Sequence, residues 1–494
     1  MTARVRISAF VLLLLVGGGC AQSVSEPAGD AVLLTHIDGL GSLSFPNSGS
    51  ADAQEAFNRG VLLLHSFEYD TAAEAFRAAQ DYDPDFALAY WGEAMTYNHP
   101  VWDQKDVAAA HAALARYAET AQARLEKAPT VRERGYLEAV EILYGDGDKQ
   151  AQDLAYMAAM KQLSDAFPSD HEALAFYALA ILGSKGGTRD FATYMRAAAA
   201  AQPVFDANPD HPGAAHYLIH SFDDPVHAPL GLTAAELYSE IAPGAAHAQH
   251  MTTHIFVAMG MWDDVVSGNI RARDVQDAQR ATAGNTANVC GHYSSWLQYG
   301  HLMRDEVAEA EQLMSDCHQR MSEEPTSSEV FYFTSMRARQ ILDTQDWGLA
   351  ARWDADLSGA GVERAAFVDG FTNAFAALQQ GDPSTARAFL AGAGTADNDR
   401  ARIYTAELRG LLALQDGRID EGIMDLEAAA ALEDLMPFEF GPPAIVKPTF
   451  ELLGEALLEL ERFADAQAAF TRATERTPGR TLSVRGLQAS AAGG

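Results

Sequence analysis

A pair of histidines recurs in this chain at an offset of 34 residues. His216 and His220 are repeated as His250 and His254, and each pair begins seven residues after a proline. Residues four apart lie on one face of a helix. A period of 34 residues is typical of repeats made of two helices, and such repeats stack on their neighbours. The sequence therefore predicts a helical repeat in which four imidazoles from adjacent helices face one space.

The pattern from Ala51 to about Pro478 is helical almost throughout. Alanine-rich stretches with spaced leucines alternate with short turns that contain Gly, Asp or Pro. Runs of alternating β-branched residues are nearly absent, which excludes a fold built on a sheet. Long helices joined by short turns pack antiparallel to their neighbours. We expect an all-α fold, a right-handed solenoid of antiparallel helix pairs.

The last repeat shows most clearly how such pairs would pack. Gly454 and Ala466 are small enough for two helices to approach closely, and Phe463 and Phe470 would fill the space between layers. Pro478 would end the second helix by removing a backbone donor. These positions resemble the tetratricopeptide repeat. The first repeat matches the same pattern at Gly60, Tyr69, Ala72, Phe76, Ala79 and Pro84.

The resemblance sets the expected domain organisation. We expect ten to eleven repeats over residues 51–480, a flexible tether over residues 21–50 and a tail over residues 481–494, with its end from Ala489 disordered. The stretches HPGAAHYLIH and APGAAHAQHMTTHIF resemble exported bacterial tetratricopeptide proteins of unknown function. That resemblance covers roughly Ala51 to His301 and implies a fold, but no established activity.

Residues 1–20 have the features of an export signal. Two arginines precede a short apolar run from Phe10 to Val16, and three glycines then lead directly to Cys20. The run is too short to span a bilayer. The segment resembles a bacterial lipoprotein signal, although Gly17 stands where that family usually has leucine. The resemblance implies lipidation of Cys20, with ordinary cleavage as the alternative, and a lipid anchor in the outer membrane facing the periplasm.

The charge balance bears on the class of partner. The chain has 68 acidic and 35 basic residues, for a formal net charge of −33. No basic patch is evident that could neutralise phosphates, so nucleic acid is not expected as a partner, and the membrane is expected to be contacted only through the anchor. A concave surface in a helical repeat favours a peptide or protein ligand.

Two further cysteines follow Cys20, namely Cys290 and Cys317. Cys290 would start the first helix of a repeat, and Cys317 would lie near the end of the antiparallel second helix. Such ends are neighbours, and an exported protein meets an oxidising environment. The sequence predicts a disulfide here, and two buried free thiols are the alternative.

The repeated histidines suggest a metal site. Imidazole is a common ligand of zinc, copper and iron, and the four repeated histidines could supply four nitrogens. His247 and His292 are candidate additional ligands, because His247 precedes His250 by three residues and His292 begins the next first helix. Two other interpretations stay open. Duplication could have copied inert histidines, or histidines in the groove could bind an acidic or peptide ligand without metal.

Motifs of known enzyme classes are missing. Neither histidine pair carries the glutamate that acts as general base in zinc metalloproteases, and no Cys-x-x-Cys-His, nucleotide-binding loop or Gly-x-Ser-x-Gly occurs. Asp223 and Asp224 could add a base or a ligand, but their place before Pro225 is typical of a turn. The sequence favours a binding or scaffold protein of the cell envelope with a histidine cluster in its groove. A metal-dependent enzyme, or a protein that binds metal or haem at the same cluster, is the alternative.

Overall fold

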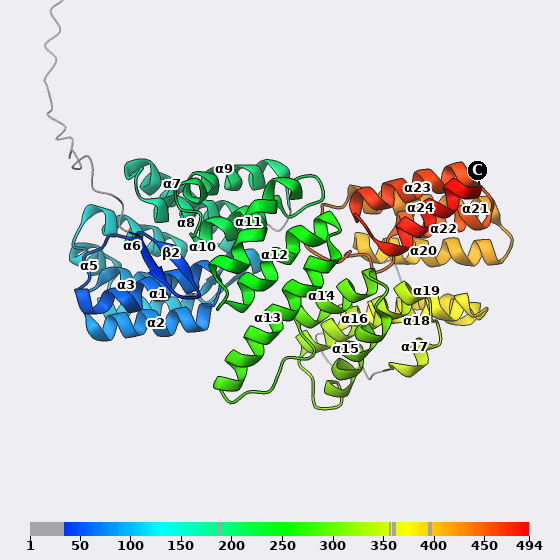
Figure 1. Cartoon of the computed structure of the whole chain (residues 1–494), viewed down its shortest axis with the longest axis horizontal. Coiled ribbons are helices and arrows are strands. Elements are labelled where there is room, and N and C mark those ends of the chain that lie inside the picture. The colour runs from blue at the N-terminus through cyan, green and yellow to red at the C-terminus, as the bar shows by residue number, and fades with distance from the viewer. Residues whose placement is uncertain (1–33, 186–188, 355–356, 358–361, 394–397, 494) are drawn as a thin grey trace, which may run out of the picture. The chain divides into compact units, whose positions relative to one another are not determined.

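The computed structural model describes residues 34–185, 189–354, 357, 362–393 and 398–493. The predicted signal segment with Cys20, and residues 21–33 of the predicted tether, lie outside the described residues. The described part is built from helices, with two short hairpins near its start (Figure 1). Among the described residues, no helix is both long and apolar enough to cross a membrane.

In the described residues, thirteen α-helices lie between Gln54 and Thr282, and α10 and α12 among them carry the repeated histidines. They are α1 (Gln54–His65), α2 (Tyr69–Tyr82), α3 (Ala87–Met95), α4 (Val107–Tyr117), α5 (Ala121–Lys127), α6 (Val131–Leu143), α7 (Lys149–Ala166), α8 (His171–Gly183), α9 (Phe191–Ala207), α10 (Pro212–Phe222), α11 (Ala228–Ile241), α12 (Ala246–Met259) and α13 (Trp262–Thr282). The remaining helices are α14 (His292–Met303), α15 (Val307–Arg320), α16 (Ser327–Thr344), α17 (Leu349–Arg352), α18 (Glu363–Gln379), α19 (Pro383–Gly392), α20 (Asp399–Gln415), α21 (Ile419–Leu435), α22 (Thr449–Glu459), α23 (Phe463–Arg476) and α24 (Thr481–Gly493).

The strands and 3-10 helices are all short. Strand β1 (Thr35–Ile37) pairs antiparallel with β2 (Gly41–Leu43), and β3 (Asn98–His99) pairs antiparallel with β4 (Gln104–Lys105). The 3-10 helices are η1 (Ala51–Ala53) and η2 (Pro100–Trp102).

Each helix packs mainly on its neighbours in sequence, and alternate helices also meet, as α10 does with α12 and α14 with α16. This arrangement of stacked helix pairs confirms the predicted all-α solenoid. Small residues make the close contacts possible. A Cβ on Gly60 or Gly92 would lie 2.9 or 2.3 Å from the ring of Phe76, so this ring fills the space between the first two pairs.

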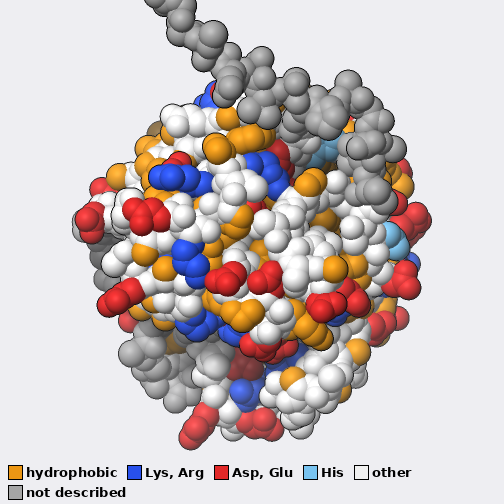
Figure 2. Space-filling view, turned by 90° about the vertical axis from the view of Figure 1, so that its left-hand side faces the viewer, with side chains coloured by type: hydrophobic (Ala, Val, Ile, Leu, Met, Phe, Trp, Pro, Cys, Tyr) orange, Lys and Arg blue, Asp and Glu red, His pale blue; other side chains and the backbone are white. Residues whose placement is uncertain are grey.

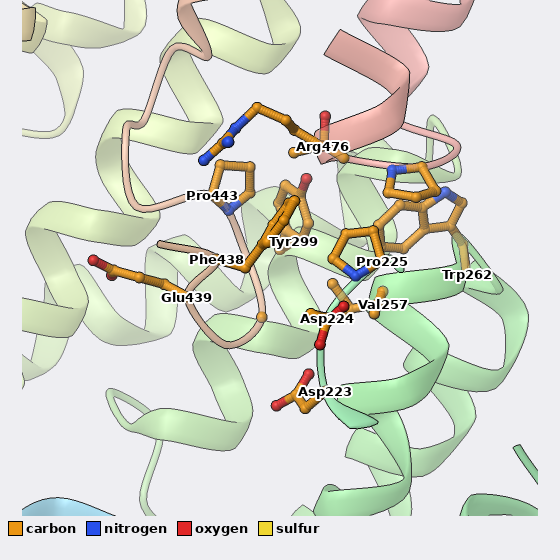
Figure 3. A pocket seen from close by; sticks show the side chains of 14 residues that line it. Asp223, Asp224, Pro225, Val257, Trp262, Tyr299, Phe438, Glu439, Pro443 and Arg476 are labelled. Atoms are coloured by element: carbon orange, nitrogen blue, oxygen red, sulfur yellow. The ribbon is translucent and has the colours of Figure 1, made fainter. Parts of the chain in front are cut away.

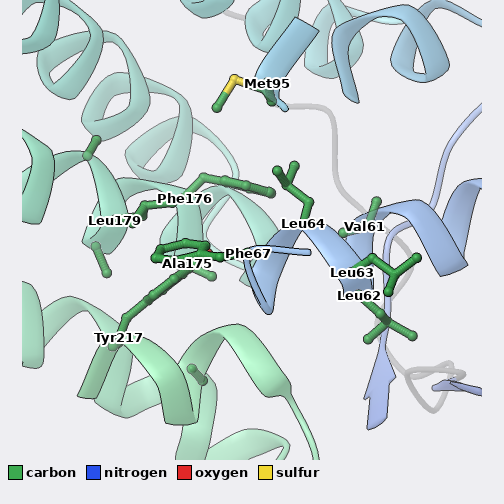
Figure 4. Packing of buried hydrophobic residues seen from close by; sticks show 14 of the residues in the cluster. Val61, Leu62, Leu63, Leu64, Phe67, Met95, Ala175, Phe176, Leu179 and Tyr217 are labelled. Atoms are coloured by element: carbon green, nitrogen blue, oxygen red, sulfur yellow. The ribbon is translucent and has the colours of Figure 1, made fainter. Parts of the chain in front are cut away.

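The core next to the histidines is formed by helices from three repeats. Leu63 and Leu64 of α1, Phe176 of α8 and Tyr217 of α10 belong to one buried cluster, and Phe67 lies between them in the turn after α1 (Figure 4). The Phe67 ring stands 4.2 Å from the His216 ring, centre to centre. The apolar core therefore extends directly to the repeated histidines.

The tether prediction is wrong for residues 34–50. This segment forms the β1–β2 hairpin and buries Leu40, Leu43 and Phe45 against the helices. The backbone N–H of Ser42 donates to the carbonyl of Asp210 at 2.9 Å. A Cβ at Gly41 would lie 2.6 Å from that carbonyl, and its φ of +93° suits glycine. The glycines and serines that suggest a linker therefore serve close packing.

The tail prediction is also wrong for the part of the tail that is described, because Thr481–Gly493 form helix α24. This helix lies on α23, where a Cβ on Gly486 would come within 2.2 Å of the Phe470 ring. Helix α24 thus covers the outer face of the last repeat, which would otherwise expose aromatic side chains to water.

A disulfide joins Cys290, just before α14, to Cys317 in α15, and their Cα atoms are 4.6 Å apart. That separation lies in the range common for disulfides, about 4.4–6.8 Å.

On the face drawn in Figure 2, acidic and basic side chains are interspersed among polar and apolar ones.

Gly454 of α22 provides a test of the repeat register. A Cβ there would lie 2.9 Å from the ring of Phe470 in α23, so Gly454→Leu should overpack the pair and lower the free energy of unfolding by roughly 1–3 kcal/mol. Urea unfolding of the variant measures this. Gly392→Leu is the control, since no atom of the described residues lies within 4 Å of a Cβ at that position. Equal stability of both variants and the parent would contradict the register.

Candidate metal centre

Helix α10 brings the first histidine pair close to the end of α1. The Nδ1 of His211 accepts from the N–H of Ala214 at 3.1 Å and caps the helix, and Pro212 occupies its first turn. A Cβ on Gly213 would lie 2.3 Å from the His65 ring, so only glycine permits this approach of α10. Every residue of α10 is buried as a result, His216 and His220 included.

Six histidines form two groups of three rather than one group of four. One ring nitrogen from each of His216, His220 and His247 lies within 4.8 Å of the other two, and we call this set the His220 trio. The same holds for His250, His254 and His292, the His254 trio. The sequence prediction joined both pairs in one site. The structure instead joins each pair to a third histidine, and His247 and His292 are full members.

The two trios adjoin each other. The ring centres of His220 and His254 are 6.0 Å apart, and those of His247 and His250 are 6.3 Å apart. Helices α10, α12 and α14 supply all six side chains. The result is a continuous row of imidazoles inside the repeat.

Hydrogen bonds hold the three rings of the His254 trio by Nδ1. His250 Nδ1 bonds Asn269 Oδ1 at 2.8 Å, His254 Nδ1 bonds Asp223 Oδ2 at 2.5 Å, and His292 Nδ1 bonds the Tyr332 hydroxyl at 3.2 Å. Metal-ligating histidines are usually held in this way, with the second nitrogen bonded to a carboxylate, carbonyl or similar group.

The Asn269 amide determines which nitrogen of His250 carries the proton. Its Nδ2 donates to the carbonyl of Val265 at 2.9 Å, so its oxygen faces His250 and must accept from Nδ1. The Asp223 carboxylate likewise accepts from His254 Nδ1. Both rings therefore direct an Nε2 lone pair inward, and these two Nε2 atoms are 3.1 Å apart. Two lone pairs at this distance repel unless a proton or a metal ion lies between them.

The His220 trio contains polar nitrogens that have no hydrogen-bond partner among the described residues. These are Nε2 of His216, both ring nitrogens of His220 and Nε2 of His247. His216 donates from Nδ1 to the carbonyl of His65 at 2.7 Å, which leaves its Nε2 as an acceptor. An unsatisfied buried polar group costs about 1–3 kcal/mol, so several in one place favour a ligand that they bind together.

Burial favours the neutral form of five of the six imidazoles. It lowers the pKa of His216 and of His292 to about 3, with neighbouring His254 adding to the effect. The pKa values of His220, His247 and His250 are also lowered well below the usual value, first by burial and then by the adjacent histidines. A neutral imidazole is the form that binds a metal ion.

A third cluster of possible metal ligands, His65, Glu172 and His211, forms hydrogen bonds among its own side chains. Glu172 accepts from His65 Nε2 at 2.7 Å and from His211 Nε2 at 3.0 Å, and His65 Nδ1 bonds the Tyr217 hydroxyl at 2.8 Å. The two histidines lower the pKa of Glu172 far below its usual range despite its burial. This cluster holds α1, α8 and α10 together and positions the carbonyl that receives His216.

Asp223 and Asp224, the two aspartates noted in the sequence, have different roles in the turn after α10. Asp224 accepts from the backbone N–H groups of Val226 and His227 and pairs with Arg189 at 3.0 Å, as a turn residue. Asp223 instead orients His254. Asp223, Asp224, Phe438 and Glu439 line the same small cavity (Figure 3).

Phe438 and Glu439 belong to the connection between α21 and α22, residues 436–448, which we call the covering segment. Its Phe440 ring stands 5.9 Å from the rings of both His220 and His254. Arg189 lies 5.4 Å from the same ring. The predicted groove is therefore covered at His220 and His254 by a segment that lies more than 180 residues further along the chain.

A cavity of about 280 Å³ remains beneath this segment. Both trios contribute to its wall, through His220, His247, His254 and His292. Its other lining groups include Trp102, Trp296, Tyr332, Arg339 and Phe440.

Several of these residues carry no signal in the sequence. Asn269 lies on α13 and Tyr332 on α16, at no fixed spacing from the histidines that they bond. Phe440 lies in a loop. The 34-residue offset identifies His216, His220, His250 and His254 and indicates His247 and His292, but it cannot indicate partners outside the repeat.

No family model matches the chain, and no curated protein is similar to it. Solved structures similar to it are helical repeats. Human IFIT1 as a dimer with m7Gppp-AAAA is 11% identical, with 90% of this chain and 91% of that chain covered and a TM-score of 0.35. The Cut9–Hcn1 hetero-tetramer of APC/C is 11% identical, with 90% and 78% covered and a TM-score of 0.33. Yeast Tom70 is 10% identical, with 89% and 95% covered and a TM-score of 0.24.

At these identities and scores, the likeness indicates no ligand for this chain. The repeat positions around Gly60 and Gly454 and the stacked antiparallel helix pairs agree with one another. Together they show a helical-repeat fold whose repeat positions resemble the tetratricopeptide pattern.

Proposed function

We propose that this protein binds a transition-metal ion on the His254 trio, inside a helical-repeat scaffold. The observation that carries the proposal is the 3.1 Å separation of the inward-facing Nε2 atoms of His250 and His254. Two nitrogens at about 2.1 Å from a tetrahedral ion are roughly 3.4 Å apart. A small side-chain movement would therefore seat both on one ion, with His292 as the third ligand.

The donor set favours zinc, copper or iron, since imidazole suits all three. Three protein nitrogens leave a fourth position of a tetrahedral ion open, as in sites that bind a further ligand. A proton shared by His250 and His254 would also relieve the repulsion. It would not explain why a ring nitrogen of His292, whose Nδ1 bonds Tyr332, lies within 4.8 Å of nitrogens of both other rings.

The His220 trio is proposed as a second, weaker site. Its unpartnered nitrogens favour an ion, but no hydrogen bond from a described residue fixes the ring of His220. Peptide or protein binding elsewhere on the repeat stays a prediction that the fold supports, and the prediction against nucleic acid rests on the chain's charge.

Metal titration of protein made without a histidine tag tests the main site. Metal-free protein should bind zinc or cobalt(II) with at least one equivalent per chain in calorimetry, and cobalt should show the visible absorption of a tetrahedral site. His292→Ala should weaken this binding at least tenfold, because it removes one of three ligands.

The matched control is His301→Ala on the same helix. His301 bonds Glu306 at 2.7 Å and lies outside both trios, so this variant should bind metal like the parent. Equal affinity in the parent, His292→Ala and His254→Ala, or no binding by any of them, would end the proposal. Loss confined to His220→Ala would move the main site to the His220 trio.

The stability of the metal-free protein should fall as the pH decreases from 7.5 to 5.5. In the unfolded chain these histidines take up a proton near pH 6.5, whereas in the folded chain the pKa of His216 is about 3. Protonation therefore favours unfolding below pH 6.5, by about 1.4 kcal/mol per histidine for each pH unit. Urea unfolding at both pH values measures this loss. His216→Leu should reduce it, and an unchanged pH dependence in that variant would show that His216 is not buried and neutral.

We also propose that the chain is exported and anchored through a lipid on Cys20. The sequence of residues 1–20 supports this, and the disulfide between Cys290 and Cys317 suits an oxidising compartment. Labelled palmitate should enter the parent protein and not Cys20→Ala when both are expressed in a bacterium with an outer membrane. Membrane-associated, labelled Cys20→Ala protein would contradict the anchor.

A further inference from the structure

Arg339 on α16 is buried without an acidic partner. The residue is 8% exposed, and among the described residues its guanidinium makes one hydrogen bond, a long one of 3.4 Å to the carbonyl of Pro443. No described carboxylate lies within ion-pair distance of it. Asp343, one turn further along the same helix, is paired with Arg480. A buried cation without a counter-ion is costly in free energy.

Other buried arginines of this protein show how such a group is normally accommodated. Arg337, two residues earlier on α16, bonds Asp369 at 2.6 Å, Asn373 at 2.7 Å and two backbone carbonyls. Arg480 bonds Glu451 through two nitrogens, at 2.9 and 3.0 Å, and also pairs with Asp343. Arg339 is therefore an exception among comparable side chains in the same part of the fold.

Arg339 lines the 280 Å³ cavity that His254 and His292 also line. The carboxylate among the lining residues belongs to Glu439, and that group is already paired with Arg400. Burial lowers the pKa of Arg339, and the nearby carboxylate of Asp343 offsets this effect only in part. The chain has 68 acidic residues, so a buried arginine that forms no ion pair is unusual in it.

Aromatic and aliphatic side chains form much of the remaining wall. Trp102, Trp296, Phe331 and Phe440 line the cavity, together with valine and proline side chains. Apolar walls with a few polar groups are typical of small-molecule sites. A larger cavity of about 750 Å³ adjoins this one, and the two share Arg364, Val368 and Ala444 in their walls.

We propose that this cavity binds a small carboxylate with a flat apolar body, whose carboxylate pairs with Arg339 and whose body lies against Trp296 and Phe440. The contact with Arg339 is independent of metal. A further contact with the open position of an ion on the His254 trio rests on the function proposed above. A planar guanidinium that can form two parallel hydrogen bonds suits a carboxylate.

Calorimetry with 2-naphthoate tests the proposal in two steps. Metal-free parent protein should bind one equivalent, and Arg339→Gln should weaken this binding at least tenfold. The neutral analogue 2-naphthalenemethanol should bind the parent and Arg339→Gln equally, because it has no charge to pair. Arg409→Gln, which removes an arginine paired at the surface with Asp425, should leave naphthoate binding unchanged.

Melting temperature shows whether Arg339→Gln is folded. Removing a buried charge that has no ion pair should leave the melting temperature of the ligand-free protein unchanged or raise it. A drop of several degrees would show that Arg339 is structural and would overturn the proposal. So would naphthoate binding that is absent from the parent or equal in the parent and Arg339→Gln.

The second step adds zinc. If the carboxylate also reaches the ion, zinc should tighten naphthoate binding in the parent and not in His292→Ala. Arg339-dependent binding without metal, combined with no zinc binding, would sustain the cavity and reject the metal site. Zinc binding without naphthoate binding would sustain the metal site and reject the cavity.

Discussion

A neutral imidazole has one N–H to donate and one lone pair to offer, and inside an apolar core both need a partner. In this protein the N–H groups of His216, His250 and His254 are donated to oxygen acceptors that cannot donate back. Because Nδ1 of each ring carries the proton, the lone pair is on Nε2, which faces the centre of the cluster. Helix spacing alone brings rings together, but only these acceptors determine which nitrogen faces the centre.

This requirement links distant parts of the chain. The carbonyl that orients His216 belongs to His65 at the end of α1, which is held in turn by Glu172 of α8. The carboxylate that orients His254 comes from the turn after α10. Repeats usually contact only their neighbours, whereas here one polar network connects the first repeat to those in the middle. The site and the packing of the repeats thus depend on each other.

The sequence predicted the helical repeat well because small and large residues recur at fixed spacing, as around Gly454 and Phe470. It predicted the histidine pairs for the same reason. It failed for residues 34–50 and for the described part of the tail. Their composition is that of a linker, but small residues such as Gly41 and Gly486 allow these segments to pack closely on the helices. The partition into two trios, and partners such as Asn269 and Tyr332, depend on how helices turn toward one another. No local pattern encodes that rotation.

The covering segment has a consequence for the order in which the protein is assembled. Residues 436–448 follow all the helices that carry histidines, so a chain that emerges from its N-terminus presents both trios to solvent before Phe440 exists to enclose them. The ion that we propose would then reach the nitrogens by the shortest path while the chain is being made. After closure it must pass the segment or the neighbouring cavity. Loading and release would follow different routes, with release the slower of the two.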